Sequence, residues 1–229
     1  YITALNNIFS YSNVVYKIVG DIDLAEGTLT IATGSTLDFQ GGSFSNGTIV
    51  GNNTTIVNTS NSYIFKENLN TTGGFILEEL DIRWFGAKPD FNGTTGTDCS
   101  PAIQKALDWS QYFYGIYLGI HGKFYLETPI VTNMDLNMRG DRVPGKILFT
   151  EAAGNPNQSI TSTIYVKGGI TAFTLNGFGD TAKLIKFNLE NIRFTAPWGI
   201  SNDNSEWTGA NTILISSPTI GGPSRPGSI

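Results

Sequence analysis

Residues 84–111 decide the fold expected of this chain, and they read WFGAKPDFNGTTGTDCSPAIQKALDWSQ. A loop of Gly, Asp and Thr leads into a stretch whose apolar residues recur at helical spacing. On either side, the sequence consists of short β-type runs joined by Gly, Asn and Thr. One helix among so many strands does not make a layer of its own, so we expect it to cover an end of a β structure.

The start of this helix has the chemistry of a helix N-terminus. The Ser100 hydroxyl can accept a hydrogen bond from an unpaired N–H of the first turn, and Pro101 suits the first helical position. The apolar stripe consists of Ala102, Ile103, Ala106 and Leu107. The segment predicts a helix over about 100–111 whose stripe covers an open end of the β structure, although an ordinary surface helix would show a similar pattern.

The composition excludes several classes of partner. Of the 229 residues only 14% are charged, against roughly 25% in ordinary soluble domains. The net charge is −5 and there is no basic run, so nucleic acid and anionic membranes are poor partners. No apolar run approaches the ~20 residues that cross a bilayer. Cys99 is the only cysteine, and we expect a buried structural thiol.

Short runs with alternating polarity predict a series of strands. Before the helix they cover 16–19, 22–24, 29–31, 36–39, 47–50, 54–57 and 63–65. After it they cover 116–118, 123–126, 130–132, 136–138, 146–150, 162–166, 172–175, 184–189, 192–194 and 212–215. Asn46-Gly47 alone would suggest a hairpin, yet strands so short and so evenly spaced also fit the coils of a solenoid. A β-sandwich would give similar strand lengths.

From Gly86 to Leu107 the chain resembles the pectate-lyase-type superfamily of right-handed parallel β-helices. The matching residues are Gly86-Ala87-Lys88-Pro89-Asp90, Asp98 and Ala102-Ile103-Gln104-Lys105-Ala106-Leu107. Cys99 and Ser100 depart from the usual Asp-Thr of that family. The resemblance covers about 84–194. It implies an all-β chain with a right-handed parallel β-helix, one N-terminal capping helix and a small β module in front.

The upstream part resembles a block of the tail-fibre and tailspike proteins of phages of Bacteroides-type gut bacteria. The similarity lies in Asp21-Ile22-Asp23-Leu24 and in residues 35–54, which read STLDFQGGSFSNGTIVGNNT. It implies a virion tail appendage, extracellular when acting, that docks on other tail proteins and contacts a host surface glycan. It also implies a homotrimer.

Two domains follow from these resemblances. Residues 1–80 form an N-terminal β module, a stem or connector, and residues 81–229 form the start of a β-helix that continues beyond the chain. The first module is either separate or stacked against the far side of the helix, and we favour a separate module.

Catalysis is the weaker functional hypothesis. Glycan cleavage needs paired carboxylates, or a carboxylate with a basic residue, on one groove. The candidates are Asp135, Asp141, Asp180 and Glu190, none of which forms a recognisable pair within one strand. Carboxylates on successive coils could meet, because strands stack about 4.8 Å apart. His121 is the only histidine, so we expect no metal and no cofactor.

A polar loop between two tryptophans is the candidate for glycan binding. Trp198 and Trp207 flank it, and it contains Asn202 and Asp203. Aromatic faces can stack on sugar C–H groups while amides bond hydroxyls, although both tryptophans could instead pack the loop onto its own fold or a neighbouring subunit. The sequence predicts a structural, host-attachment component of a phage tail, with a glycan depolymerase (lyase or hydrolase) as the alternative.

Overall fold

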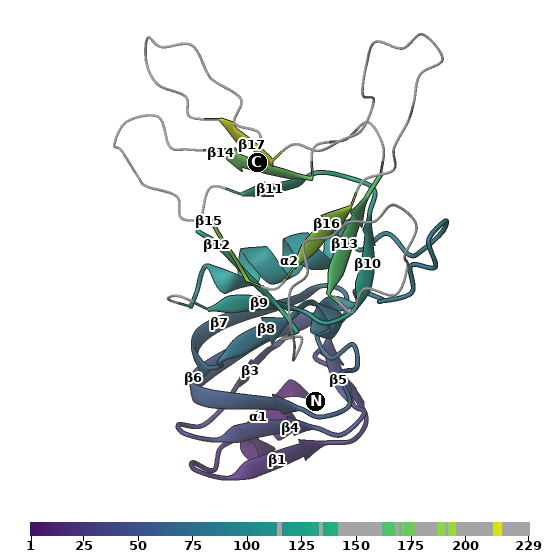
Figure 1. Ribbon diagram of the computed structural model, residues 1–229. Helices are drawn as coiled ribbons and strands as arrows, with labels where there is room; N and C mark the ends of the chain where they lie inside the picture. Colours follow the sequence, from purple (N-terminus) through teal and green to yellow (C-terminus); the bar gives the residue numbers. More distant parts are fainter. Residues whose placement is uncertain are drawn as a thin grey trace, which may run out of the picture. The chain divides into compact units, whose positions relative to one another are not determined.

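The chain is mostly β-strand in the computed structural model, which describes residues 1–113, 116–132, 135–141, 162–167, 170, 172–176, 187–190, 192–195 and 213–216 (Figure 1). The all-β class expected from the sequence is confirmed. The contacts divide the chain into two compact units. Unit 1 holds Tyr1–Ala87 and Pro101–Leu118, and unit 2 holds Lys88–Ser100 and Gly119–Ile229. The predicted domain limit at residue 80 stays a prediction, because contacts within one structure do not show where independent folding begins.

Unit 1 contains β6, the longest of the described strands. Its strands are β1 (Val15–Ile18), β2 (Asp21–Asp23), β3 (Thr28–Thr30), β4 (Thr36–Phe39), β5 (Ser43–Ser45), β6 (Gly47–Asn58), β7 (Leu69–Ile76) and β8 (Glu79–Asp81). The helix α1 (Ile2–Ile8) precedes them, and a 3₁₀ turn, η1 (Ile82–Phe85), follows. The sequence pattern did not predict α1, β5, β7, β8 or η1.

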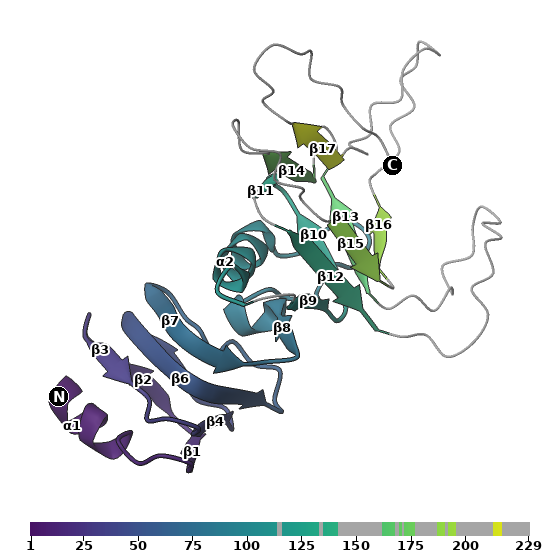
Figure 2. The same cartoon turned by 90° about the vertical axis from the view of Figure 1, so that its left-hand side faces the viewer.

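The strands of unit 1 stack in parallel. β1 pairs with β4 and β4 with β6, while β3 and β7 also pair with β6 and β2 pairs with β5. In this register Tyr16 lies opposite Leu37, and Leu37 lies opposite Ile56. Both views show β4, β6 and β7 as successive layers (Figures 1 and 2). Parallel neighbours need a crossover between them, and here the crossovers carry the other short strands.

The hairpin interpretation of Asn46-Gly47 is wrong. β5 and β6, on either side of it, pair with other strands and not with each other. Asn46 has a positive φ of 54°, which an asparagine tolerates better than most residues. The dipeptide therefore turns the chain at a corner between two sheets.

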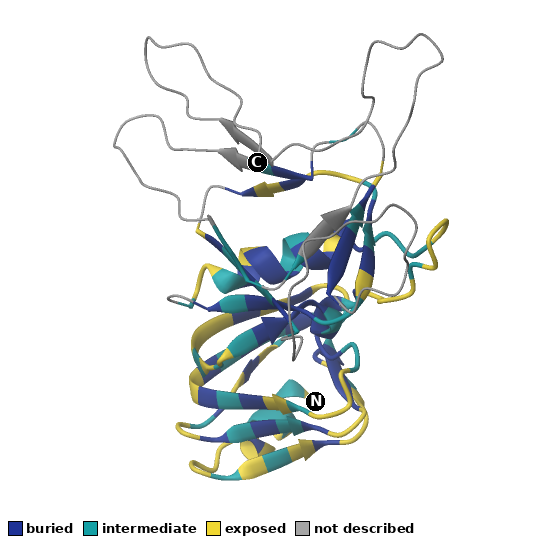
Figure 3. Ribbon diagram, in the orientation of Figure 1, coloured by how far each residue is buried: buried dark blue, intermediate teal, exposed yellow. Residues whose placement is uncertain are grey.

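The interior of unit 1 is apolar and rich in phenylalanine. Buried positions alternate with exposed ones along β3 and with intermediate ones along β4 (Figure 3). Phe39, Phe44 and Phe65 are at most 1% exposed. The Phe39 ring centroid lies 5.7 Å from that of Phe44 and 5.8 Å from that of Phe65. Edge-to-face contacts of this kind add stability beyond the burial of area.

The helix α2 (Ser100–Ser110) is confirmed as a helix. Within unit 1, the Trp109 ring lies 4.7 Å from Phe65 and 5.5 Å from both Phe75 and Phe85. Lys105 Nζ donates to the carbonyls of Phe65 and Lys66. Part of β7 and the segment at Phe65 therefore pack against α2 within unit 1.

Unit 2 repeats the parallel pattern. Its described strands are β10 (Lys123–Leu126), β11 (Ile130–Thr132), β12 (Leu136–Gly140), β13 (Thr163–Val166), β14 (Phe173–Asn176), β15 (Phe187–Glu190), β16 (Arg193–Thr195) and β17 (Ile213–Ser216). They stack as β10-β13-β16, β11-β14-β17 and β12-β15, all parallel. β9 (Tyr117–Ile120) spans the limit between the units.

The loop before α2 forms hydrogen bonds and a ring contact with strand residues of unit 2. Cys99 N–H donates to the Tyr125 carbonyl at 2.8 Å, and the Phe91 ring stacks on Tyr125 at 5.1 Å. The Ser100 hydroxyl accepts from the N–H groups of Glu127 and Thr128, at 3.1 and 3.0 Å. The predicted capping role of Ser100 is therefore wrong. The Asp98 carboxylate instead accepts from the Ser100 N–H, and it stands at the positive end of the helix.

Candidate functional site

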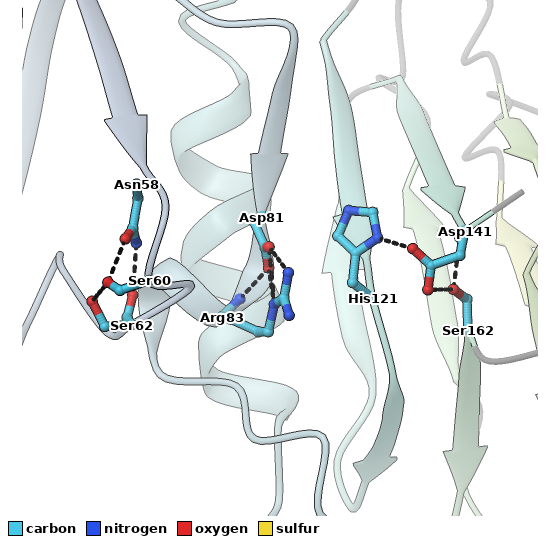
Figure 4. Close-up of polar contacts among 8 residues, drawn as sticks. All are labelled: Asn58, Ser60, Ser62, Asp81, Arg83, His121, Asp141 and Ser162. Atoms are coloured by element: carbon cyan, nitrogen blue, oxygen red, sulfur yellow. Dashed lines mark hydrogen bonds and ion pairs between the residues drawn. The ribbon is translucent and has the colours of Figure 1, made fainter. Parts of the chain in front are cut away.

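The described residues of unit 2 bring together a histidine, a carboxylate and a hydroxyl. His121 Nδ1 lies 2.6 Å from Asp141 Oδ1. Ser162 Oγ donates to Asp141 Oδ2 at 3.1 Å and accepts from the Asp141 N–H at 2.7 Å. Figure 4 shows the carboxylate between the imidazole and the hydroxyl. We call these three residues the histidine cluster.

Strand register assembles the histidine cluster. Lys123 lies opposite Thr163, and the Thr163 N–H donates to the Gly122 carbonyl at 2.8 Å. Ser162 comes directly before β13, and His121 follows β9 and precedes β10 by two residues. The pairing of β10 with β13 therefore brings them near each other. Asp141 follows the last residue of β12. Three strand ends therefore supply one residue each.

The cluster can move a proton. A carboxylate on Nδ1 fixes the orientation and tautomer of an imidazole. The His121 side chain is 24% exposed and that of Asp141 40%, so solvent or a substrate can approach. Ser162 bonds to Asp141 and not to the imidazole, so the arrangement is not that of an activated serine nucleophile. General acid or base catalysis is the chemistry that it allows.

The other predicted carboxylates lie in different settings. Asp141 is the only one of the four that belongs to the histidine cluster. Glu190, at the end of β15, accepts from Arg139 Nε at 2.9 Å, across the β12–β15 pair that places Arg139 opposite Glu190. Asp135 is exposed and precedes β12. Asp180 lies outside the described residues, and its role stays a prediction.

The predicted glycan-binding residues, Trp198, Asn202, Asp203 and Trp207, also lie outside the described residues. Their role stays a prediction as well. Among the residues that the structure describes, there is no group of three His, Cys, Asp or Glu side chains placed to hold a metal ion. No helix in the described part of the chain is long and apolar enough to cross a membrane.

Two other polar groups in Figure 4 belong to unit 1 and explain local structure. The Asp81 carboxylate accepts from the N–H and the guanidinium of Arg83, and so caps η1. Asn58 Nδ2 donates to the Ser62 carbonyl at 3.0 Å, and Ser60 Oγ donates to Asn58 Oδ1 at 2.9 Å. These bonds close the turn after β6. Neither group presents a reactive nitrogen or a pair of facing carboxylates.

Cys99 is a structural thiol, as expected. It is 0% exposed, and its single S–H is shared between the carbonyls of Lys88 and Thr97, which lie 3.4 and 3.3 Å from Sγ. Burial raises the pKa of the Cys99 thiol, and a protonated thiol is a poor nucleophile.

His121 and Ser162 could not be recognised from the sequence as members of a site. They are separated from Asp141 by twenty and twenty-one residues, and no local motif joins them. Only the register of β10 and β13 would have revealed the cluster.

Comparisons with protein-family models, curated proteins and solved structures found no match to this chain.

Proposed function

We propose that the chain is part of a right-handed parallel β-helix in a phage tail appendage, a tail fibre or tailspike. It acts as a structural, host-attachment component that contacts a cell-surface glycan. Its partners are two further copies of itself, other tail proteins and the host glycan, and its place is the virion, outside the cell when it acts.

The observation that carries this proposal is the parallel stacking of successive segments in both units. Thr36 pairs with Val15 on one side and with Thr55 on the other. In unit 2, Ile164 pairs in the same way with Phe124 and Phe194. A solenoid built of such layers gives a continuous core and a long surface from little sequence complexity. These are the properties that a stem or attachment fibre needs.

The resemblance at residues 84–107 supports the same proposal. In the β-helix superfamily this segment marks the start of a domain and supplies a helix over an open end. Here the helix has the expected apolar stripe, of which Ile103 and Ala106 are 0% exposed. The β edges of a solenoid end invite association with other strands unless they are covered.

Cell attachment tests this proposal. Fluorescently labelled protein should bind a subset of Bacteroides-type strains, and purified surface polysaccharide from a binding strain should compete. Light scattering should give three times the mass of one chain. Binding to no strain in a broad panel would contradict the attachment role, and a monomer at every concentration would contradict the trimer.

The histidine cluster favours the glycan depolymerase as a second candidate. Polysaccharide cleavage by elimination needs a base, and hydrolysis needs an acid and a base. His121, oriented by Asp141, can fill one of these roles, with the second carboxylate supplied by a neighbouring coil. Shortening of host polysaccharide that is abolished by His121→Ala and by Asp141→Asn would support this candidate. Turnover that both variants retain would exclude the cluster as its catalytic site.

A further inference from the structure

Unit 1 contains a cavity of about 500 Å³, a size typical of small-molecule sites. The end of α2 and the residues after it form one wall, and β7 forms the other. The two elements lie next to each other in both views (Figures 1 and 2). All residues that line the cavity belong to unit 1.

The cavity lies along the edge of β7 and not over one of its faces. Four consecutive residues, Leu69, Asn70, Thr71 and Thr72, line it. The side chains of Leu69 and Thr71 are buried, whereas those of Asn70 and Thr72 are exposed. Side chains alternate between the two faces of a strand, so a cavity that touches both sets must run along the backbone.

The alternation of backbone hydrogen bonds along β7 shows which of its backbone groups face the cavity. The Gly47 N–H of β6 donates to the Asn68 carbonyl at 3.0 Å. Alternate residues of a parallel strand turn their N–H and C=O toward the same neighbour, so the backbone groups of Asn70 and Thr72 face β6. Those of Leu69 and Thr71 face the other way. Among the described strands, β6 is the only one that pairs with β7.

The helix side supplies aromatic rings. Trp109 is 5% exposed and forms part of the floor, whereas Tyr112 is 54% exposed. The Tyr112 N–H donates to the Trp109 carbonyl at 3.2 Å, which fixes the backbone that carries the exposed ring. An aromatic face flanked by amides and hydroxyls suits a ligand that has both C–H and O–H groups.

The polar side chains on this wall are held in place. Gln104 Nε2 donates to Asp108 Oδ1 at 2.9 Å, and Gln111 Nε2 donates to the Asp108 carbonyl at 2.6 Å. Lys105 Nζ is engaged by two backbone carbonyls. Lys105 and Asp108 both line the cavity and carry opposite charges, so the lining has no net charge that favours an ionic ligand.

We propose that this cavity binds a neutral saccharide unit. The Tyr112 ring stacks on the sugar, and the backbone edge at Leu69 and Thr71 bonds its hydroxyls together with Asn70 and Gln111. The inference deepens the proposed glycan contact and rests on it, but it places that contact in unit 1, far along the sequence from the Trp198–Trp207 loop. An extended peptide could also pair with the β7 edge, yet the hydroxyl-rich ligand better matches an exposed ring between amide side chains.

Ligand-observed NMR with simple probes tests the inference. The probes are the methyl glycosides of glucose, galactose and N-acetylglucosamine, with methyl glucuronide as the matched anionic probe. At least one neutral glycoside should show saturation transfer and shift the Thr71 amide resonance, and the glucuronide should bind more weakly. Tyr112→Ala should weaken binding about tenfold. The control is Tyr11→Ala, because Tyr11 is also an exposed tyrosine of unit 1, 68% exposed, but does not line the cavity.

Three results would overturn the inference. They are saturation transfer from no glycoside, equal affinity for Tyr112→Ala and the wild type, and a shift of the Thr71 amide by a β-strand hexapeptide but by none of the sugars. Unchanged thermal unfolding of Tyr112→Ala shows that the variant is folded. Cell attachment, measured in parallel, separates the two proposals. Attachment without glycoside binding contradicts only the cavity site, whereas glycoside binding without attachment contradicts only the attachment role.

Discussion

The two units share parallel strand stacking but differ in what joins one layer to the next. In unit 1 the layers are joined by rings: Phe65 contacts Phe39 on one side and Trp109 on the other, at centroid distances of 5.8 and 4.7 Å. In the described part of unit 2 the layers are also joined by polar side chains, such as the histidine cluster and the Arg139–Glu190 pair. Unit 1 also has an exposed ion pair, Lys66 with Asp21, so the two units differ in how much buried ring packing joins their layers and not in whether charges pair.

This difference predicts which unit contributes more to the stability of the fold and which unit carries groups that could act in catalysis. Apolar rings stacked between parallel strands stabilise the fold strongly but offer no group that can accept or donate a proton. Charged side chains placed on strand ends stabilise less, because exposed pairs contribute little, but they leave reactive atoms at the surface. We therefore expect the largest stability effects from unit 1 and the effects on glycan turnover, if there is turnover, from unit 2.

Phe65→Ala should have the largest effect. Phe65 is 1% exposed and contacts the rings of Trp84, Phe85 and Trp109, so we expect a loss of about 3–5 kcal/mol in the free energy of unfolding. Chemical denaturation measures it. Phe124→Ala in unit 2 is the matched variant: Phe124 is 0% exposed, but no ring contact is described for it. An equal or larger loss for Phe124→Ala would contradict the larger contribution of ring contacts to the stability of unit 1.

Gly73→Ala should come next, with a loss of about 1–3 kcal/mol. Gly73 has a φ of +83°, and an added Cβ would lie 2.2 Å from the Gly51 carbonyl oxygen. The two backbones of β6 and β7 can approach only because the side chain is absent. At the neighbouring Gly74 an added Cβ would come no closer than 3.5 Å to any atom. Thermal unfolding of both variants should therefore separate them, and equal melting temperatures would contradict the close approach.

Alternating polarity was enough to predict several strands of both units. The bounds of β4, β10 and β11 match the predicted 36–39, 123–126 and 130–132. Where the pattern was interrupted, prediction failed. Separate strands were predicted at 47–50 and 54–57, but residues 51–53 between them form an irregularity inside the single strand β6, between Gly51 and Thr54.

Other elements carry no local signal at all. β7 reads LNTTGGFI, with two glycines and little alternation, and it is a strand because β6 pairs with it. α1 has no side-chain cap and no buried residue. The histidine cluster and the cavity depend on strand register and on the placement of α2, which are long-range properties. Residue types alone could suggest Asp141 as a candidate but not the imidazole beside it.

Ser100→Ala tests the buried polar contacts of unit 2 and should lower the free energy of unfolding by about 1–3 kcal/mol. Ser100 is 2% exposed, and its hydroxyl accepts from the N–H groups of Glu127 and Thr128. The variant leaves the Thr128 N–H without this acceptor. Ser35→Ala is the counterpart in unit 1, where a buried hydroxyl donates once, to the Tyr11 carbonyl at 2.9 Å. Urea denaturation should rank Ser100→Ala as the more destabilised, and the reverse order would contradict a greater dependence of unit 2 on polar contacts.

Asp21→Asn should have the smallest effect, at most about 1 kcal/mol, because the pair that it breaks is exposed. Lys66 Nζ lies 2.7 Å from the Asp21 carboxylate, which also accepts from Ser43 Oγ. The hydrogen bond from Lys66, with that from Ser43, lowers the pKa of Asp21 below its ordinary 3.8. A lowered carboxyl pKa stabilises the fold fully above the ordinary value, and this contribution is lost as the pH falls through the native value.

The difference in unfolding free energy between wild type and Asp21→Asn should therefore be constant near neutral pH and shrink below pH 3.8. It should also shrink in high salt, because the pair is open to solvent. Lys66→Met removes the other partner, so the double variant should lose less than the sum of the two single losses. The opposite result is that Asp21→Asn loses as much unfolding free energy as Ser100→Ala, with no change in acid or in high salt. That result would mean that unit 1 depends on polar contacts as strongly as unit 2, and it would contradict the contrast between the two units.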